Sequence, residues 1–180
     1  HLLRPGKARV MQLAYVSLPG RGANDRFLAA FAQAAQAAGL RLAGTVQTNP
    51  QREGRVKCDM DLRVLPDGPV LRISEDRGNG ARGCRLDAGV LEAAVLGVAA
   101  ALPGADLLLV NKFGKQESEG RGFAPLIAEA LSRGIPVLAG VNGLNLPAFQ
   151  AFADGLATPL PADQAAVMGW CQRACRLQPA

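Results

Sequence analysis

Short apolar runs alternate with segments whose apolar residues recur at helical spacing over most of the chain. Runs typical of buried strands cover 12–17, 40–46, 106–110 and 135–139, with a further short extended piece at 156–160. Segments with helical periodicity cover 24–38, 87–102, 125–133, 147–152 and 162–176. Asp87 is the expected cap of the second of these helices. Because strand, turn, helix and strand follow one another repeatedly, we expect a parallel sheet covered by helices.

The stretch after the second strand has a different pattern. Residues 57–65 alternate loosely, a proline–glycine turn occupies 66–68, and 70–74 continue as a second extended segment, which predicts a β-hairpin. We therefore expect an α/β fold of three layers, with a mainly parallel sheet and a β-hairpin insertion. The 180 residues suit one domain. We place it at 11–176, with 1–10 as an N-terminal extension or the remnant of a tag.

The first strand leads into a glycine turn at the place where a P-loop would stand. A P-loop has the pattern GxxxxGK[ST]; its N–H groups wrap phosphate, its lysine neutralises charge and its hydroxyl holds magnesium. The matching stretch, 17–24, begins with serine and has Ala23 for the lysine and Asn24 for the hydroxyl residue. A helix N-terminus behind glycines still binds anions through its N–H groups and dipole.

This turn makes the expected fold P-loop nucleoside-triphosphatase-like, and it supplies the first candidate ligand-binding residues. They are Gly20, Arg21, Gly22, Asn24 and Asp25. Asn24 or Asp25 is also expected to cap the following helix. An ordinary strand-to-helix turn without a ligand is the alternative.

Two polar loops are expected at the carboxyl ends of parallel strands, where α/β proteins bind ligands. One loop, 111–122, follows the third apolar run, and the other covers 75–85. If the strands before the glycine turn and before 111–122 are parallel neighbours, the loop cations share a cleft with the turn. The candidate ligand-binding residues there are Arg82, Arg85, Asn111, Lys112, Lys115 and Arg121, joined by Arg77. Glu117 and Glu119 are the candidate general bases, or they pair with these cations in a solvated loop.

Composition narrows the classes of function. Hydrophobic residues make up 49% of the chain, yet no apolar run approaches the roughly 20 residues that span a bilayer, and no signal-peptide pattern is visible. We therefore expect a cytoplasmic protein with no membrane partner. The net charge of +5 arises within residues 1–87, as a solvated basic surface or as an attraction for a small anionic ligand. The absence of a dense basic cluster interleaved with aromatics argues against nucleic acid.

Histidine and cysteine chemistry has few candidates in this sequence. The only histidine is His1, which argues against Ser-His-Asp catalysis, Cys-His catalysis and histidine-rich metal sites. Cys58 and Cys84 flank the basic middle section, where a thiolate would suit a soft metal or molybdenum; two unconnected core residues are the alternative. Cys171 and Cys175 stand four apart on an expected helix and are better explained as small core residues.

Two motifs give the chain a family resemblance. Residues 106–117 have the sequence DLLLVNKFGKQE, and residues 83–87 have the sequence GCRLD. In this order they resemble a bacterial family of unknown function, domain of unknown function 2478, over about residues 11–176. The resemblance implies a link to molybdenum transport or to molybdoenzyme genes, without giving a substrate.

More distantly, the chain is similar to small P-loop nucleoside-triphosphatases, in which an acidic pair after a strand serves magnesium and water. At that place this sequence has Asn111 and Lys112, which cannot ligate magnesium as carboxylates do. The missing lysine and the missing acidic pair together favour a protein that binds a nucleotide or an oxyanion such as phosphate or molybdate without hydrolysis. An atypical nucleoside-triphosphatase or phosphotransferase and an interaction module without a ligand are the alternatives. The sequence leaves open whether the chain is an enzyme and whether it forms a homo-oligomer.

Overall fold

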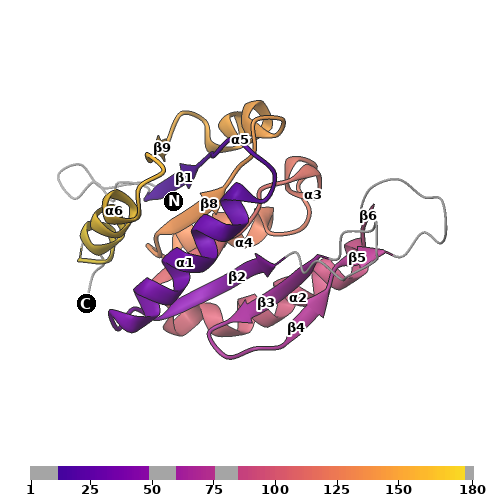
Figure 1. Cartoon of the computed structure of the whole chain (residues 1–180), viewed down its shortest axis with the longest axis horizontal. Coiled ribbons are helices and arrows are strands. Elements are labelled where there is room, and N and C mark those ends of the chain that lie inside the picture. Colours follow the sequence, from indigo (N-terminus) through magenta and orange to yellow (C-terminus); the bar gives the residue numbers. More distant parts are fainter. Residues whose placement is uncertain (1–11, 49–59, 76–84, 177–180) are drawn as a thin grey trace.

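The main sheet of this fold has the strand order β4-β3-β2-β7-β8-β1-β9 (Figure 1). The computed structural model of the chain describes residues 12–48, 60–75 and 85–176. The strands of the main sheet are β1 (Leu13–Val16), β2 (Leu42–Thr48), β3 (Asp61–Leu65), β4 (Val70–Arg72), β7 (Leu107–Val110), β8 (Val137–Gly140) and β9 (Ala157–Pro159). The pairs among β1, β2, β7, β8 and β9 are parallel, whereas β3 and β4 add antiparallel strands beside β2. A separate ladder joins β5 (Ser74–Glu75) to β6 (Arg85–Leu86).

Helices cover both faces of the main sheet, so the fold has three layers (Figure 1). They are α1 (Ala23–Ala37), α2 (Ala88–Ala101), α3 (Lys115–Ser118), α4 (Ala124–Ser132), α5 (Leu146–Ala153) and α6 (Gln164–Arg176), with a 3-10 turn at Leu102–Gly104. Leu13 and Tyr15 of β1 share a core with α2, α4 and α5, whereas Ala14 and Val16 share a core with α1 and α6. This separation follows from the two-residue period of a strand. None of the helices in the described ranges is long and apolar enough to cross a membrane.

The predicted fold class is confirmed: the chain is an α/β protein with a mainly parallel sheet. The described part of the predicted hairpin is present as β3 and β4, and it extends the main sheet at the β2 edge. Asp87 caps α2 as expected, because its Oδ1 accepts the N–H groups of Gly89 and Val90. Local pattern was sufficient here because capping chemistry and strand alternation act over a few residues.

Two expectations are wrong. The N-cap of α1 is Gly22, with φ +72 and no side-chain cap, and the Asn24 side chain reaches backwards instead. The strand before the glycine turn, β1, and the strand before the 111–122 loop, β7, are not neighbours, because β8 lies between them. The crossover rule fixes the handedness of a connection and leaves open which strand comes between two others.

The strands β2 and β7 come closest at Gly44. Its partner in the parallel register is Leu109, and a Cβ atom on Gly44 would lie 2.0 Å from the carbonyl oxygen of Leu109. Gly44 also has φ +139, a backbone conformation that side chains disfavour. Glycine therefore permits an approach that brings the carboxyl end of β2 beside the residue that follows β7.

Candidate functional site

The candidate site lies at the edge of the sheet where the parallel strands end. The carboxyl ends of β1, β2, β7 and β8 meet there because these strands run parallel through their shared pairs. The glycine turn follows β1 and the 111–122 loop follows β7, so both lie at this edge although β8 separates their strands. Open α/β sheets bind their ligands at this kind of edge.

The glycine turn between β1 and α1 is closed by one of its own side chains. Gly20 has φ +102 and Gly22 has φ +72, so the backbone passes twice through the left-handed region. The Oδ1 atom of Asn24 accepts the backbone N–H of Leu18 at 2.8 Å. Asn24 therefore stabilises the entry to the turn, in the manner of side chains that bond to nearby backbone.

Only part of the N–H groups in this turn can serve an anion. The N–H of Ala23 donates to the carbonyl oxygen of Gly20 at 3.3 Å and is therefore not available to an anion. Within the described ranges, the N–H groups of Gly22 and Asn24 meet no acceptor. They stand at the N-terminus of a helix of 15 residues, where the dipole favours negative charge.

Asn111 connects this turn to the rest of the sheet edge. Its side chain is 2% exposed. The Nδ2 group donates to Oδ1 of Asp25 on α1 at 2.7 Å, and Oδ1 accepts the backbone N–H of Gln47 on β2 at 3.0 Å. Because a backbone N–H can only donate, the bond from Gln47 fixes which amide atom is the oxygen. One side chain thus joins β7, β2 and the first turn of α1.

Glu117 is used inside its own loop. Its carboxylate is 4% exposed; Oε1 accepts the N–H of Gly114 at 2.9 Å and Oε2 accepts the N–H of Phe123 at 3.0 Å. Burial raises the pKa of the Glu117 carboxyl, while these N–H groups and the charge of Lys112 oppose the rise. Gly122, at φ +60, leaves room for the carboxylate, since a Cβ there would lie 1.8 Å from Oε2. The geometry makes Glu117 the residue that holds the loop in shape.

Replacing Glu117 by glutamine is expected to destabilise the protein by about 2 kcal/mol, because the amide nitrogen cannot accept one of the two buried N–H groups. Chemical denaturation of Glu117→Gln measures this change. Glu119→Gln is the matched control: Glu119 is exposed and paired with Arg121, so its replacement should change stability by less than about 0.5 kcal/mol. Equal effects of the two substitutions would contradict the role given to Glu117.

The cations of the 111–122 loop have different surroundings. Lys112 is exposed and directly follows Asn111, and its side chain runs past Gly114 toward the carboxylate of Glu117. Lys115 is exposed at the start of α3. Arg121 forms an ion pair with Glu119, and its Nε donates to Oε1 of Gln116 at 3.0 Å. Arg121 and Glu119 therefore partly neutralise each other, as in a solvated, ion-paired loop.

The other residues predicted for the site are only partly covered by the structure. Four lie outside the described residues: Arg77, Arg82, Cys58 and Cys84. Arg85 is described by its backbone alone, in β6. Cys171 is buried in the core between α1 and α6, with the half-buried Cys175 packed beside it and their sulfur atoms 4.0 Å apart. In the described part of the chain, no group of three or more histidine, cysteine or acidic side chains could hold a metal.

Two residues of the site gave no signal in the sequence analysis. Gln47 is 8% exposed in β2 and donates its N–H to Asn111. Glu92 on α2 accepts the N–H of Gly122 through Oε1 at 2.9 Å, which attaches the end of the loop to a helix. A polar residue near the end of a buried strand and a carboxylate within an otherwise apolar helix are the patterns that could have marked them.

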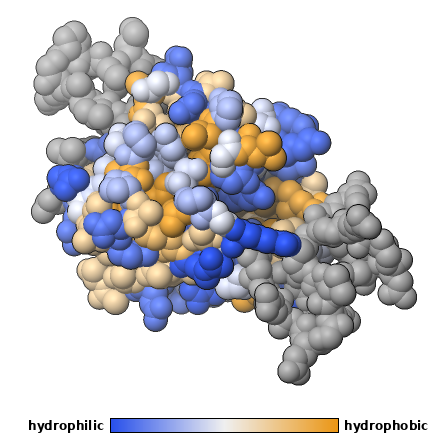
Figure 2. Space-filling view, turned by 45° about the horizontal axis from the view of Figure 1, so that its top comes forward, coloured by the Kyte–Doolittle hydropathy of each residue, from blue (hydrophilic) through white to orange (hydrophobic). Residues whose placement is uncertain are grey.

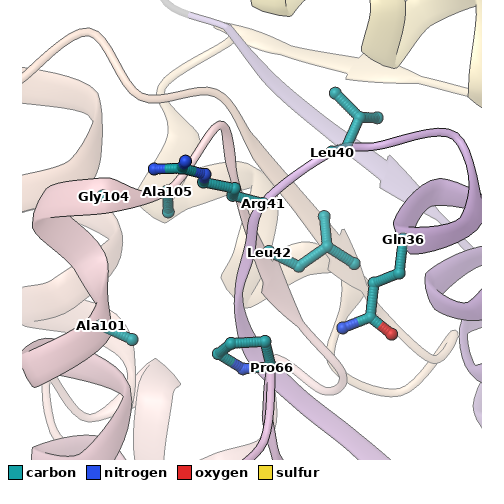
Figure 3. A pocket seen from close by; sticks show the side chains of 8 residues that line it. All are labelled: Gln36, Leu40, Arg41, Leu42, Pro66, Ala101, Gly104 and Ala105. Atoms are coloured by element: carbon teal, nitrogen blue, oxygen red, sulfur yellow. The ribbon is translucent and has the colours of Figure 1, made fainter.

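A cavity of about 400 Å³ lies at the opposite edge of the sheet. Figure 3 shows its lining, which consists of Gln36, Leu40, Arg41, Leu42, Pro66, Ala101, Gly104 and Ala105. Leu42 begins β2 and Ala105 stands just before β7, so the cavity lies at the amino ends of these strands. It is therefore separate from the glycine turn and from Asn111.

Comparison with known proteins supports this assignment of the fold. A family model described as a protein of unknown function (DUF2478) matches residues 13–170. The molybdenum import ATP-binding protein ModC 2 of Bradyrhizobium diazoefficiens is 37% identical over 147 residues, which are 81% of this chain and 16% of that protein. The chain thus spans about one sixth of the length of the curated relative it matches. The solution structure of a human cancer-related nucleoside triphosphatase is similar in fold, with a TM-score of 0.56 and 18% identity, covering 82% of this chain and 86% of that one.

Proposed function

Since the chain belongs to the DUF2478 family of proteins of unknown function and has a P-loop-like fold, we propose that it binds a small anionic ligand without hydrolysing it. The ligand class is a nucleotide or an oxyanion of the phosphate or molybdate type. The binding site is the edge formed by the glycine turn, Asn111 and Lys112. The protein acts in the cytoplasm, in connection with molybdenum metabolism.

The observation that carries this proposal is the double replacement at the two positions on which phosphoryl transfer depends. Ala23 stands where a P-loop has its lysine, and Asn111 stands where the magnesium-serving acid follows the strand. Charge stabilisation by lysine and metal supplies most of the catalysis in such enzymes. The N–H groups of Gly22 and Asn24 at the helix N-terminus still favour an anion. Binding therefore survives the changes that remove catalysis.

The molybdenum connection rests on the relative from Bradyrhizobium diazoefficiens, whose name describes molybdenum import and ATP binding. This chain corresponds to a small part of that long protein. A role for this chain beside molybdenum import would be to sense either the transported oxyanion or the nucleotide. Molybdate, phosphate and adenine nucleotides are the ligands to compare first.

An interaction module without a small ligand is the second candidate. It is favoured by the side chain of Asn24, which satisfies the N–H of Leu18 from within the turn, and by the N–H of Ala23, which is bonded to Gly20. The face seen in Figure 2 mixes hydrophobic and hydrophilic residues and does not single out one docking patch.

Hydrolysis of a nucleotide with Glu117 as the general base is less favoured, since both of its carboxylate oxygens accept backbone N–H groups.

Saturable binding without turnover is the expected result when the protein is titrated with molybdate, phosphate, ATP and GTP in a calorimeter. Lys112→Ala should weaken the binding, and more so at low salt, because it removes a screened charge beside the site. Arg133→Ala makes the same charge change at the end of α4 and should leave the affinity unchanged. A turnover of ATP or GTP on the order of 1 per second, abolished by Lys112→Ala, would contradict the proposal. If none of the four ligands binds, the result favours the second candidate function, an interaction module without a small ligand.

A further inference from the structure

The P-loop fold implies a magnesium ion, and the site can be tested for residues that would hold it. In nucleotide-binding members of this fold, magnesium takes oxygen ligands from the first turn of the helix after the P-loop and from an acid at the carboxyl end of another strand of the sheet. The corresponding residues here are Asn24 on α1 and Asn111 after β7. Magnesium prefers carboxylate and hydroxyl oxygens in nearly ideal octahedral geometry.

Neither residue offers a carboxylate or hydroxyl oxygen, and the amide oxygen of each already accepts a backbone N–H. The Oδ1 of Asn24 accepts the N–H of Leu18, and the Oδ1 of Asn111 accepts the N–H of Gln47. The other atom of the Asn111 amide is Nδ2, a donor, and it is directed at the Asp25 carboxylate from 2.7 Å. An amide N–H cannot ligate a cation. The nearby carboxylate, that of Asp25 in the first turn of α1, accepts this amide group. The side chains therefore bond to one another and do not supply the set of oxygen ligands that magnesium takes.

We propose that the hydrogen bond between Asn111 and Asp25 takes the bridging place of the metal, so that this site binds its anion without magnesium. In a metal-dependent site, the ion joins the helix after the P-loop to the strand that carries the acid, through oxygen atoms on both. Here the same two elements, α1 and the end of β7, are joined directly by side chains. The Gln47 N–H holds the Asn111 amide in the required orientation.

This inference rests on the proposed function and narrows the class of ligand. A nucleoside triphosphate carries several negative charges on adjacent phosphates, which lysine and magnesium normally balance. With Ala23 in place of lysine and without that set of oxygen ligands for magnesium, the site suits a free oxyanion of low charge. Inorganic phosphate and molybdate have that chemistry, and both are expected to bind in the presence of EDTA.

The substitution Asn111→Asp tests the place assigned to the metal. It puts a second carboxylate at hydrogen-bond distance from Asp25, where like charges disfavour folding. We expect its melting temperature to fall by roughly 5 °C at neutral pH and to recover in millimolar Mg²⁺, which two close carboxylates can bind. The wild type should show no response to Mg²⁺. The exchange variant Asp25→Asn/Asn111→Asp is the matched control, since it restores one amide facing one carboxylate and should be insensitive to Mg²⁺.

An Asn111→Asp variant that is destabilised but not rescued by Mg²⁺ would overturn the assignment, because the metal position would then lie elsewhere. The wild type supplies a second test that does not depend on any variant folding. Mn²⁺ added to the labelled protein should leave the side-chain amide signals of Asn24 and Asn111 sharp; selective broadening of these signals would also overturn the inference. Calorimetry in EDTA and with Mg²⁺ distinguishes failure of the proposed function from failure of the metal-free site. Absence of binding of phosphate, molybdate, ATP and GTP both in EDTA and with Mg²⁺ refutes the proposed function, whereas binding of phosphate or molybdate only after Mg²⁺ is added refutes the metal-free site alone.

Discussion

Replacing Gly44 by alanine is expected to lower the free energy of unfolding by more than about 3 kcal/mol. The added Cβ would lie 2.0 Å from the carbonyl oxygen of Leu109 and 2.8 Å from its carbonyl carbon. Both atoms belong to backbone inside the sheet, so neither can move aside as a flexible side chain would. The strands β2 and β7 would have to separate, and the bond from the Gln47 N–H to Asn111 would be lost with them. Urea denaturation measures the change.

Gly39→Ala is the control for the conformational part of this effect. Gly39 follows α1 with φ +89, and a Cβ there would meet no atom within 4 Å. Its replacement should cost about 1–2 kcal/mol, the cost of a side chain in the left-handed region. If Gly44→Ala were no more destabilising than Gly39→Ala, the close approach of β2 and β7 would be disproved.

Restoring the missing lysine is expected to increase the affinity for phosphate and molybdate by roughly tenfold or more. Ala23→Lys places an ammonium group at the first residue of α1, beside the N–H groups of Gly22 and Asn24. One charge-assisted hydrogen bond contributes about 1.5–3 kcal/mol, which corresponds to at least a tenfold change in the dissociation constant. Calorimetry on the variant and the wild type measures the gain.

Ala37→Lys adds the same charge at the exposed far end of α1, about 20 Å away at 1.5 Å per residue. It should leave the affinity close to that of the wild type, since a distant exposed charge is screened. An equal gain from both lysines would mean that net charge, and not the geometry of the turn, attracts the anion. No gain from Ala23→Lys would mean that the side chain at position 23 does not point toward the anion, unlike the lysine of a P-loop.

The fold was predictable because the sequence repeats a local signal. Strands such as 107–110 are apolar at every position, as burial on both faces requires, and Asp87 carries the chemistry of a helix cap. That the glycine turn and the 111–122 loop lie at one edge was predictable for the same reason, since polar residues at 20–25 and 111–122 follow such strands. These features depend only on residues close together in the chain, so a single sequence is enough to predict them.

The features that escaped prediction depend on distant partners. The position of β8 between β1 and β7 is set by how the whole sheet packs, and no local pattern encodes it. Glu117 is a residue type that often acts as a catalytic base, yet its two carboxylate oxygens accept backbone N–H groups of its own loop. The sequence shows Asn111 only as a replacement for the acidic residue of related enzymes. The hydrogen-bond partners of its amide, Asp25 and Gln47, stand 86 and 64 residues away in the chain.

The central claim is that the edge with the glycine turn and Asn111 binds a free oxyanion. It is tested most directly by recording backbone amide signals residue by residue while the protein is titrated with molybdate in EDTA. We predict saturable shifts of the Gly22 and Asn24 amides, since these N–H groups would donate to the anion. Saturation without any shift of these two amides, or shifts confined to Leu42 and Ala105 at the opposite edge, would contradict the account.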